Sequence, residues 1–135
     1  MENSYTLNTD GGSRGNPGPS AIGGVIKNGE GKIVCQFSEF TGESTNNVAE
    51  YSAIIKGLKL ALENDIKNLS CFLDSELVVK QIKGIYRVKD ANLQILHSKV
   101  KNLVKDFDFV NFTHVRREQN SEADKLVNQA MDGRR

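Results

Sequence analysis

Four acidic residues stand where their side chains could meet and bind a cation: Asp10, Glu50, Asp74 and Asp124. Carboxylates that are brought together repel one another unless a cation offsets their charge. Mg²⁺ suits such a group because it takes oxygen ligands, keeps several waters and commonly bridges carboxylates to phosphates. No cluster of cysteine and histidine accompanies the acids in the sequence, which disfavours zinc. The residue types therefore indicate a site for a hard divalent cation.

Each acid also has an ordinary structural explanation when it is considered alone. Asp10 precedes a glycine and could form an Asx-turn, and Asp74 could cap the helix that follows it. Glu50 could complement the positive end of a helix. Asp124 could close a capping box that begins at Ser121. No single acid is diagnostic, so the elements that carry the acids decide whether they meet.

Strand and helix patterns alternate along the chain after an initial three-stranded meander. In chain order the predicted elements are strands 5–10, 21–27 and 32–40, a helix 45–62, a strand 69–73, helices 75–84 and 90–104, a strand 107–115, and a helix from 121. Thr45, Asp90 and Ser121 are expected to cap helices. The glycine- and proline-rich stretch 11–19 is expected to be irregular, so the first strand should end at Asp10.

This order predicts an α/β fold with one mixed sheet and helices on both faces. The strands ending at Leu73 and Val115 can lie parallel to the first strand. Side chains just beyond the carboxyl ends of neighbouring parallel strands converge in one crevice of such a sheet. Adjacent strands are about 4.8 Å apart, so Asp10 and Asp74 should lie side by side.

Composition predicts a single soluble domain over residues 1–135, with 38% hydrophobic and 26% charged residues. No apolar run approaches the about 20 residues that span a bilayer, and no signal-peptide pattern opens the chain, so a cytoplasmic location is expected. Cys35 and Cys71 are expected to be buried thiols rather than a disulfide. Nothing in the sequence indicates an obligate protein partner, and a monomer is expected.

The net charge of the chain indicates little about its binding partners, whereas the local distribution of charge indicates more. The chain carries 18 basic and 17 acidic residues, a net charge of +1, which does not by itself predict nucleic-acid binding. Between Val79 and Lys105 only one acid, Asp90, accompanies a series of basic residues: Lys80, Lys83, Arg87, Lys89, Lys99, Lys101 and Lys105. This segment could contact phosphates, although it could also form solvated helix faces.

Four sequence motifs, in order along nearly the whole chain, resemble type 1 ribonuclease H. They are Asp10-Gly11-Gly12-Ser13-Arg14-Gly15-Asn16-Pro17-Gly18, Thr45-Asn46-Asn47-Val48-Ala49-Glu50, Leu73-Asp74-Ser75-Glu76-Leu77-Val78-Val79 and Asn120-Ser121-Glu122-Ala123-Asp124. The compact form, with Tyr86-Arg87-Val88-Lys89 and His114-Val115-Arg116-Arg117-Glu118-Gln119, is similar to the shorter bacterial and archaeal branch.

The resemblance implies the ribonuclease H-like fold, a five-stranded mixed sheet in which strands 1–3 are antiparallel and strands 4 and 5 run parallel to strand 1. It carries the family's metal-binding catalytic acids onto Asp10, Glu50, Asp74 and Asp124. It also implies two Mg²⁺ ions, or Mn²⁺, and hydrolysis of the RNA strand of an RNA/DNA hybrid to products with 5′-phosphate and 3′-hydroxyl ends.

The same resemblance implies a substrate-binding set. Glu50, Asn46 and Asn47 match residues that read the RNA strand from the minor groove, including a ribose 2′-hydroxyl. Asn16 and Thr45 match residues that hold a phosphate of the DNA strand; turn and cap chemistry is the alternative for both. The complete predicted set is Gly11, Asn16, Thr45, Asn46, Asn47, Ser75, Lys80, Lys83 and Arg87.

The chain departs from the family in the loop before the last acid. Many relatives have a histidine there, whereas residues 116–121 contain none, and His114 falls earlier, inside the predicted strand. Arg116, Arg117 or Glu118 could take its role. The basic protrusion of some bacterial relatives is missing and no hybrid-binding module is expected before Tyr5. Weak, distributive binding through the basic residues after Asp74 is therefore expected.

Three other interpretations stay open at this stage. A nuclease of the same superfamily could act on duplex RNA or within a larger polymerase or transposase, although the chain's length disfavours the latter. A non-catalytic module that binds hybrids or Ca²⁺ is disfavoured because all four acids are present. A purely structural α/β domain would require four coincidental motifs.

Overall fold

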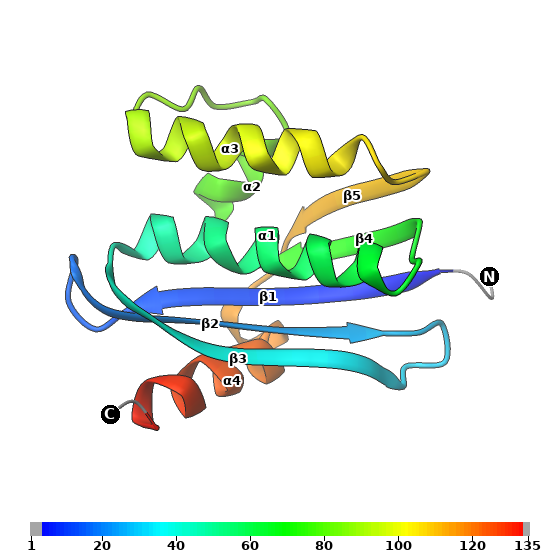
Figure 1. Cartoon of the computed structure of the whole chain (residues 1–135), viewed down its shortest axis with the longest axis horizontal. Coiled ribbons are helices and arrows are strands. Elements are labelled where there is room, and N and C mark those ends of the chain that lie inside the picture. The colour runs from blue at the N-terminus through cyan, green and yellow to red at the C-terminus, as the bar shows by residue number, and fades with distance from the viewer. Residues whose placement is uncertain (1–3, 134–135) are drawn as a thin grey trace.

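The computed structural model describes residues 4–133 and forms one five-stranded sheet with helices on both faces (Figure 1). The elements are β1 (Tyr5–Ser13), β2 (Gly18–Lys27), β3 (Ile33–Ser44), α1 (Asn46–Glu63), β4 (Asn68–Leu73), α2 (Glu76–Ile82), α3 (Ala91–Val104), β5 (Phe109–His114), the short 3₁₀ helix η1 (Arg117–Gln119) and α4 (Ser121–Asp132). The prediction of a single domain over 1–135 extends beyond the described residues and stays a prediction.

The strand order is β3-β2-β1-β4-β5, with β1 to β3 antiparallel and β4 and β5 parallel to β1. The predicted fold class is therefore confirmed. Pairing of β1 with β4 ends at Thr9 opposite Leu73. Asp10 and Asp74 come directly after this last pair, so the register places them side by side.

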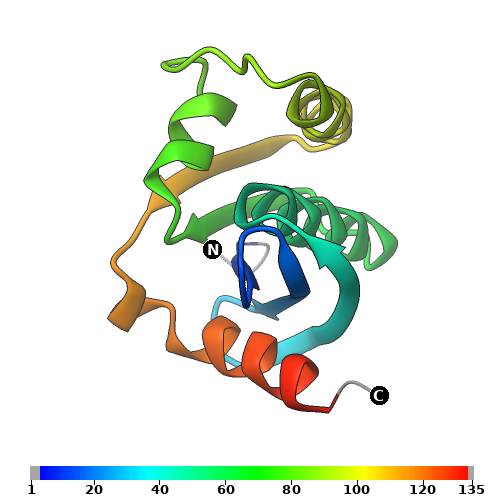
Figure 2. The same cartoon turned by 90° about the vertical axis from the view of Figure 1, so that its left-hand side faces the viewer.

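Two layers of helix bury the sheet. The main core lies between the sheet, α1 and α3, where Leu7, Tyr51, Ile54 and Leu58 have no exposed surface. A smaller cluster on the other face packs Val127 and Met131 of α4 against Ala21 of β2. Figure 2 shows α4 on the opposite side of the sheet from α1 and α3. None of the helices within residues 4–133 is long and apolar enough to cross a membrane.

Several predicted helix starts are confirmed by their caps. The Oγ1 atom of Thr45 accepts the N–H of Val48 at 3.2 Å, and a carboxylate oxygen of Asp90 accepts the N–H of Leu93 at 3.0 Å. These caps are local in sequence, which is why the chain alone could predict them.

Several predicted boundaries were wrong, most of them because pairing with a neighbouring strand decides where a strand begins or ends. The first strand does not end at Asp10: residues 11–13 continue β1, because Gly11 to Ser13 pair with Ser20 to Ile22 of β2. β2 accordingly begins at Gly18, and β3 continues past Phe40 to Ser44. The last strand is shorter than predicted, at Phe109–His114. Ser121 does not cap the last helix, whose N-cap is Asn120.

Both cysteines are free thiols, as predicted. Cys71 is fully buried, and its burial raises the pKa of the thiol above the ordinary range. Cys35 is only half-buried, because it lies on the edge strand β3, so the prediction of burial holds for one of the two.

Candidate active site

Asp10, Glu50 and Asp74 form a compact group at the end of the β1–β4 pairing. Each offers a carboxylate oxygen, and these oxygens all lie within 4.8 Å of one another. Asp10 and Glu50 are 8% and 6% exposed, and Asp74 is half-buried. These three predicted site residues come from β1, α1 and the turn after β4, so only the fold brings them together.

The ordinary structural explanations for these acids do not hold in the structure. Asp10 lies inside β1, opposite Gly23, rather than in a turn. The hydroxyl of Ser75, not the carboxylate of Asp74, caps α2 by accepting the N–H of Val78. Glu50 lies beyond the first turn of α1. The three carboxylates are thus free of local roles and face one another.

Burial and mutual repulsion dominate the electrostatics of the group. Burial, followed by repulsion from Asp74, raises the pKa of Asp10 from its ordinary 3.8 to about 7. Burial and the neighbouring Asp10 raise the pKa of Glu50 well above its ordinary value. The pKa of Asp74 is also raised, chiefly by burial, although a hydrogen bond from Asn120 opposes this. A bound divalent cation would offset this charge.

Glu50 is held by the close approach of α1 to β1. The N–H of Gly11 donates to Oε1 of Glu50 at 3.3 Å. A Cβ atom at Gly11 would lie 2.3 Å from the Ala49 carbonyl oxygen, so only glycine allows this approach. The other carboxylate oxygen, Oε2, is buried without a hydrogen-bond partner. A buried, unpartnered carboxylate oxygen among other acids fits a hard cation, and Asp10, Glu50 and Asp74 would hold it.

Asp124 lies on α4 next to Asp10, whose pKa it helps to raise, but it is not one of the three acids whose oxygens all lie within 4.8 Å of one another. Its carboxylate is 3.5 Å from the guanidinium of Arg117 and accepts a hydrogen bond from Nδ2 of Asn128 at 3.4 Å. The predicted capping box with Ser121 does not form. Asp124 lines the same cavity of about 620 Å³ as the other three acids. The structure therefore brings the four predicted acids to one cavity, with three of them in one compact group and Asp124 next to Asp10.

The same cavity, which we call the acid cavity, also includes several of the predicted substrate-binding residues. Gly11, Asn46, Asn47 and Ser75 line it, together with Arg117. Of the three loop candidates, Arg117 is thus the one that reaches the acids, and its charge lowers the pKa of Asp74. Arg116 and Glu118 pair with each other at 3.3 Å on the surface.

A second cavity of about 420 Å³ adjoins the start of α1. Asn16, Thr45, Asn46 and Asn47 line it, so the structure groups these four predicted residues. Asn16 accepts the N–H of Asn46 at 3.1 Å, and the side chain of Asn46 accepts the N–H of Ser13 at 2.8 Å. These bonds tie the β1–β2 connection to α1. Thr45 caps α1 as predicted, whereas the Asn16 side chain bonds the first residue of α1 rather than its own turn, and neither contact excludes a role in binding.

The basic residues after Asp74 lie away from the acids. Lys80 pairs with Glu76 at 3.0 Å, and its Nζ lies 5.1 Å from the ring centroid of Tyr86. Lys83 and Arg87 are exposed. None of the three lines the acid cavity, so any contact with a substrate would be distant from the reacting bond.

Asn120 was not identified from the sequence as a functional residue, although it belongs to the last motif. It is 1% exposed. Its Nδ2 donates to the Thr9 carbonyl at 2.8 Å and to Asp74 Oδ2 at 3.4 Å, and its Oδ1 accepts from Asn8 at 3.0 Å. Only the fold, through partners 46 to 112 residues away, shows these contacts.

Comparison with known proteins identifies the class first. A family model described as reverse transcriptase-like matches residues 8–130. The chain is also similar to the solved structure of RNase H1 from Halobacterium salinarum, with a TM-score of 0.94 and 38% identity, covering 97% of this chain and 99% of that one. The chain therefore belongs to the type 1 ribonuclease H family, as its motifs predicted.

Other relatives add detail. The curated Ribonuclease HI of Halobacterium salinarum is 41% identical over 91% of this chain and 62% of the relative, and the Mycobacterium tuberculosis bifunctional protein Rv2228c is 38% identical over 93% and 35%. The chain thus spans less than two thirds of these relatives. A structure of LC11-RNase H1 in complex with RNA/DNA hybrid has a TM-score of 0.89 and 40% identity over 95% of this chain and 96% of that one.

Proposed function

We propose that this protein is an endoribonuclease that hydrolyses the RNA strand of RNA/DNA hybrids in a reaction that depends on divalent cations. The observation that carries the proposal is the group of three carboxylates within 4.8 Å of one another, two of them buried and all three with raised pKa values, which contains an unpartnered oxygen on Glu50. A hybrid-bound relative with the same fold supports the choice of substrate.

The four acids would bind two Mg²⁺ ions, or Mn²⁺, with Asp10, Glu50 and Asp74 as the core of the site and Asp124 as the fourth ligand. When bound, such a pair of ions activates the attacking water and stabilises the leaving 3′ oxygen. The products would then carry 5′-phosphate and 3′-hydroxyl ends. The chain's own contribution is to hold the carboxylates in place and to position the scissile phosphate beside them.

Recognition of RNA would come from the side chains along the cavity. Asn46, Asn47 and Glu50 offer amide and carboxylate groups that can hydrogen-bond a ribose 2′-hydroxyl from the minor groove. Gly11 and Ser75 complete this wall of the cavity. The adjoining cavity at Asn16 and Thr45 would receive a phosphate of the DNA strand.

Arg117 would act in place of the missing loop histidine. Its guanidinium lines the acid cavity and pairs with Asp124, and it can donate several hydrogen bonds to a phosphate but cannot serve as a base near neutral pH. We therefore assign it a role in holding the phosphate near the acids rather than in proton transfer.

A cleavage assay on end-labelled strands tests the proposal. RNA/DNA hybrid, duplex RNA and duplex DNA are each incubated with Mg²⁺, Mn²⁺, Ca²⁺ or chelator. The expected result is cleavage within the RNA strand of the hybrid, with Mg²⁺ or Mn²⁺ only. Equal cleavage of duplex RNA would widen the substrate class, and hybrid binding without cleavage in any metal would show a binding module instead.

A further inference from the structure

The buried amide of Asn120 joins the three elements that carry Asp10, Asp74 and Asp124. It contacts β1 through the Thr9 carbonyl, next to Asp10, and it contacts the Asp74 carboxylate after β4. Its own backbone carbonyl accepts the N–H of Asp124 at 3.1 Å, which is the first hydrogen bond of α4. One residue thus links the positions of these three acids.

The orientation of the amide is fixed by its partners. The Thr9 carbonyl can only accept, so the atom 2.8 Å from it must be the nitrogen of Asn120. The second N–H points to Asp74, and the oxygen accepts from Nδ2 of Asn8. Both N–H groups and the oxygen are used, so a buried polar side chain is fully satisfied at this junction.

The helix start itself does not use this side chain. Asparagine is a favoured N-cap because its oxygen can accept an N–H of the first turn, which contributes about 1 kcal/mol. Asn120 occupies the N-cap position of α4 but makes no such side-chain bond. The side chain is directed at the sheet instead, so its contribution is to the placement of α4 rather than to the helix alone.

We propose that Asn120 is a positioning residue that holds the Asp74 carboxylate and sets α4 so that Asp124 can join Asp10, Glu50 and Asp74 around a cation. This inference rests on the proposed function. Asp124 lies one helical turn after Asn120, where its carboxylate is next to Asp10 and also pairs with Arg117 and Asn128. Its reach toward the group therefore depends on where α4 begins.

The test uses two variants and one matched control. Asn120→Ala removes the amide. Asn8→Ala removes one hydrogen bond of the amide, the one that Oδ1 of Asn120 accepts, and changes neither Asn120 nor any of the acids. Ser38→Ala is the control, because it also removes one side-chain hydrogen bond between the sheet and α4, to the Leu126 carbonyl, but from β3, two strands away from Asp10, and without a hydrogen bond to Asn120 or to any of the four acids.

Two readouts separate positioning from general stability. The first is the rise in thermal unfolding midpoint when Mg²⁺ is added without substrate, since a ligand that binds the folded state stabilises it. The second is kcat and KM on hybrid across a Mg²⁺ series. Groups that orient metal ligands typically affect affinity or activity about 10- to 100-fold. We expect Asn120→Ala to need at least about tenfold more Mg²⁺ and to lose kcat with little change in KM.

Asn8→Ala should shift both readouts in the same direction by a smaller factor, and Ser38→Ala should leave both at the parent's values. If Asn120→Ala fails to fold, the inference is tested by comparing the Mg²⁺ response and kcat of Asn8→Ala with those of Ser38→Ala. A stability loss in Asn120→Ala or Asn8→Ala with the parent's Mg²⁺ response and kcat would overturn the inference. A parent that neither responds to Mg²⁺ nor cuts hybrid would overturn the proposed function as well.

Discussion

Asp10 is the proposed metal ligand whose substitution tests the candidate site most directly. It is 8% exposed, lies among other acids and has a pKa raised to about 7. Asp10→Asn would remove a proposed metal ligand and the repulsion together, so hybrid cleavage should fall by at least about a thousandfold, that is about 4 kcal/mol of transition-state stabilisation, while metal-free stability holds or rises. Cleavage assays and urea unfolding in chelator measure both. Substantial Mg²⁺-dependent cleavage by a folded variant would refute the assignment.

The raised pKa of Asp10 also predicts how stability depends on pH without metal. An unfolded chain releases this proton near 3.8, whereas the folded chain holds it up to about 7. The unfolding free energy should therefore fall as pH rises between these values, by roughly 1–3 kcal/mol between pH 5 and 8, because one pKa step corresponds to about 1.4 kcal/mol and relaxation reduces the full effect.

Urea unfolding in chelator across this pH range checks the slope, with Asp10→Asn as the control that should flatten it. The raised pKa values of Glu50 and Asp74 act in the same direction. With Mg²⁺ present the trend should weaken or reverse, since the cation binds the deprotonated acids. Metal-free stability that rises steadily from pH 5 to 8 would contradict the electrostatic account of the site.

Substitution of Asn47 tests recognition of the hybrid separately from metal binding. It lines both the acid cavity and the adjoining one, but it is not part of the compact acid group. Asn47→Ala should raise KM for hybrid or lower kcat/KM by about tenfold, the effect of losing one or two hydrogen bonds, and leave the Mg²⁺-induced rise in melting midpoint unchanged. A large loss of that Mg²⁺ response would place Asn47 in the metal site instead.

At the scale of elements, the approach of α1 to β1 is the feature that sets the position of Glu50. A Cβ at Gly11 would meet the Ala49 backbone at 2.3 Å, whereas the nearest atom to a Cβ at Gly12 is 4.0 Å away. Gly11→Ala should therefore lower stability by about 1–3 kcal/mol, as overpacking does, and should also reduce cleavage by displacing Glu50.

Gly12→Ala is the matched control, one position along the same strand, and should stay within about 0.5 kcal/mol of the parent in urea unfolding. Equal losses in both variants would mean that glycine is required in this strand for its backbone conformation. The close packing of α1 on β1 would then not explain the requirement for Gly11.

Local signals explain what the sequence could predict about these elements. Thr45 and Asp90 cap helices within three residues, and the spacing of apolar residues marks α1. The continuation of β1 through Ser13 depends on pairing with β2. The glycine-rich sequence of this stretch is typical of a turn, so the sequence alone did not predict the strand. The N-cap of α4 was misassigned to Ser121 because the side chain of Asn120 is bonded to distant residues rather than to its own helix.

In the candidate site, too, the sequence predicts some features and misses others. Strand order and register place Asp10 beside Asp74, and that much follows from counting strands and crossover connections. The unpartnered oxygen of Glu50, the pairing of Asp124 with Arg117 and the Asn120 junction depend on side-chain packing between elements remote in sequence. No local pattern carries that information.

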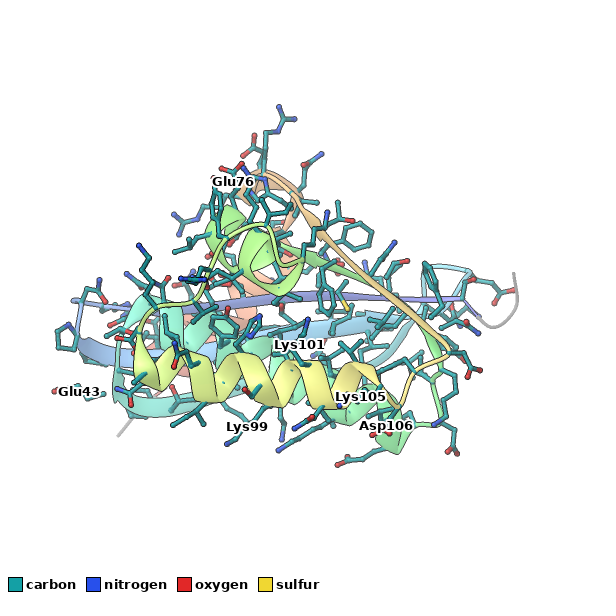
Figure 3. The ribbon with its side chains drawn as sticks, turned by 90° about the horizontal axis from the view of Figure 1, so that it is seen from above. Glu43, Glu76, Lys99, Lys101, Lys105 and Asp106 are labelled. Atoms are coloured by element: carbon teal, nitrogen blue, oxygen red, sulfur yellow. The ribbon has the colours of Figure 1, made fainter. Side chains whose placement is uncertain are left out.

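At the scale of the whole molecule, the proposed RNA/DNA hybrid substrate must lie against one face of the protein. The exposed residues after Asp74 include Lys83 and Arg87, while Lys80 is already paired with Glu76. Lys80 lies on α2, and Lys83 and Arg87 follow it, whereas Figure 3 shows Lys99, Lys101 and Lys105 along α3 and at its end, so the basic segment found in the sequence is divided between two parts of the fold. Only a group that faces the substrate should contribute to its salt dependence.

The Lys80/Lys83/Arg87→Ala variant tests the first group and Lys99/Lys101/Lys105→Ala, with the same loss of charge, tests the second. Each phosphate contact contributes about 0.9 to the slope of log affinity against log salt for a DNA duplex. Because Glu76 offsets Lys80, the first variant should lose nearer two such contacts than three, bind more weakly at low salt, and keep its turnover at saturating hybrid. Hybrid affinity measured across a salt series would place the binding face on α3 if only the second variant had the shallower slope.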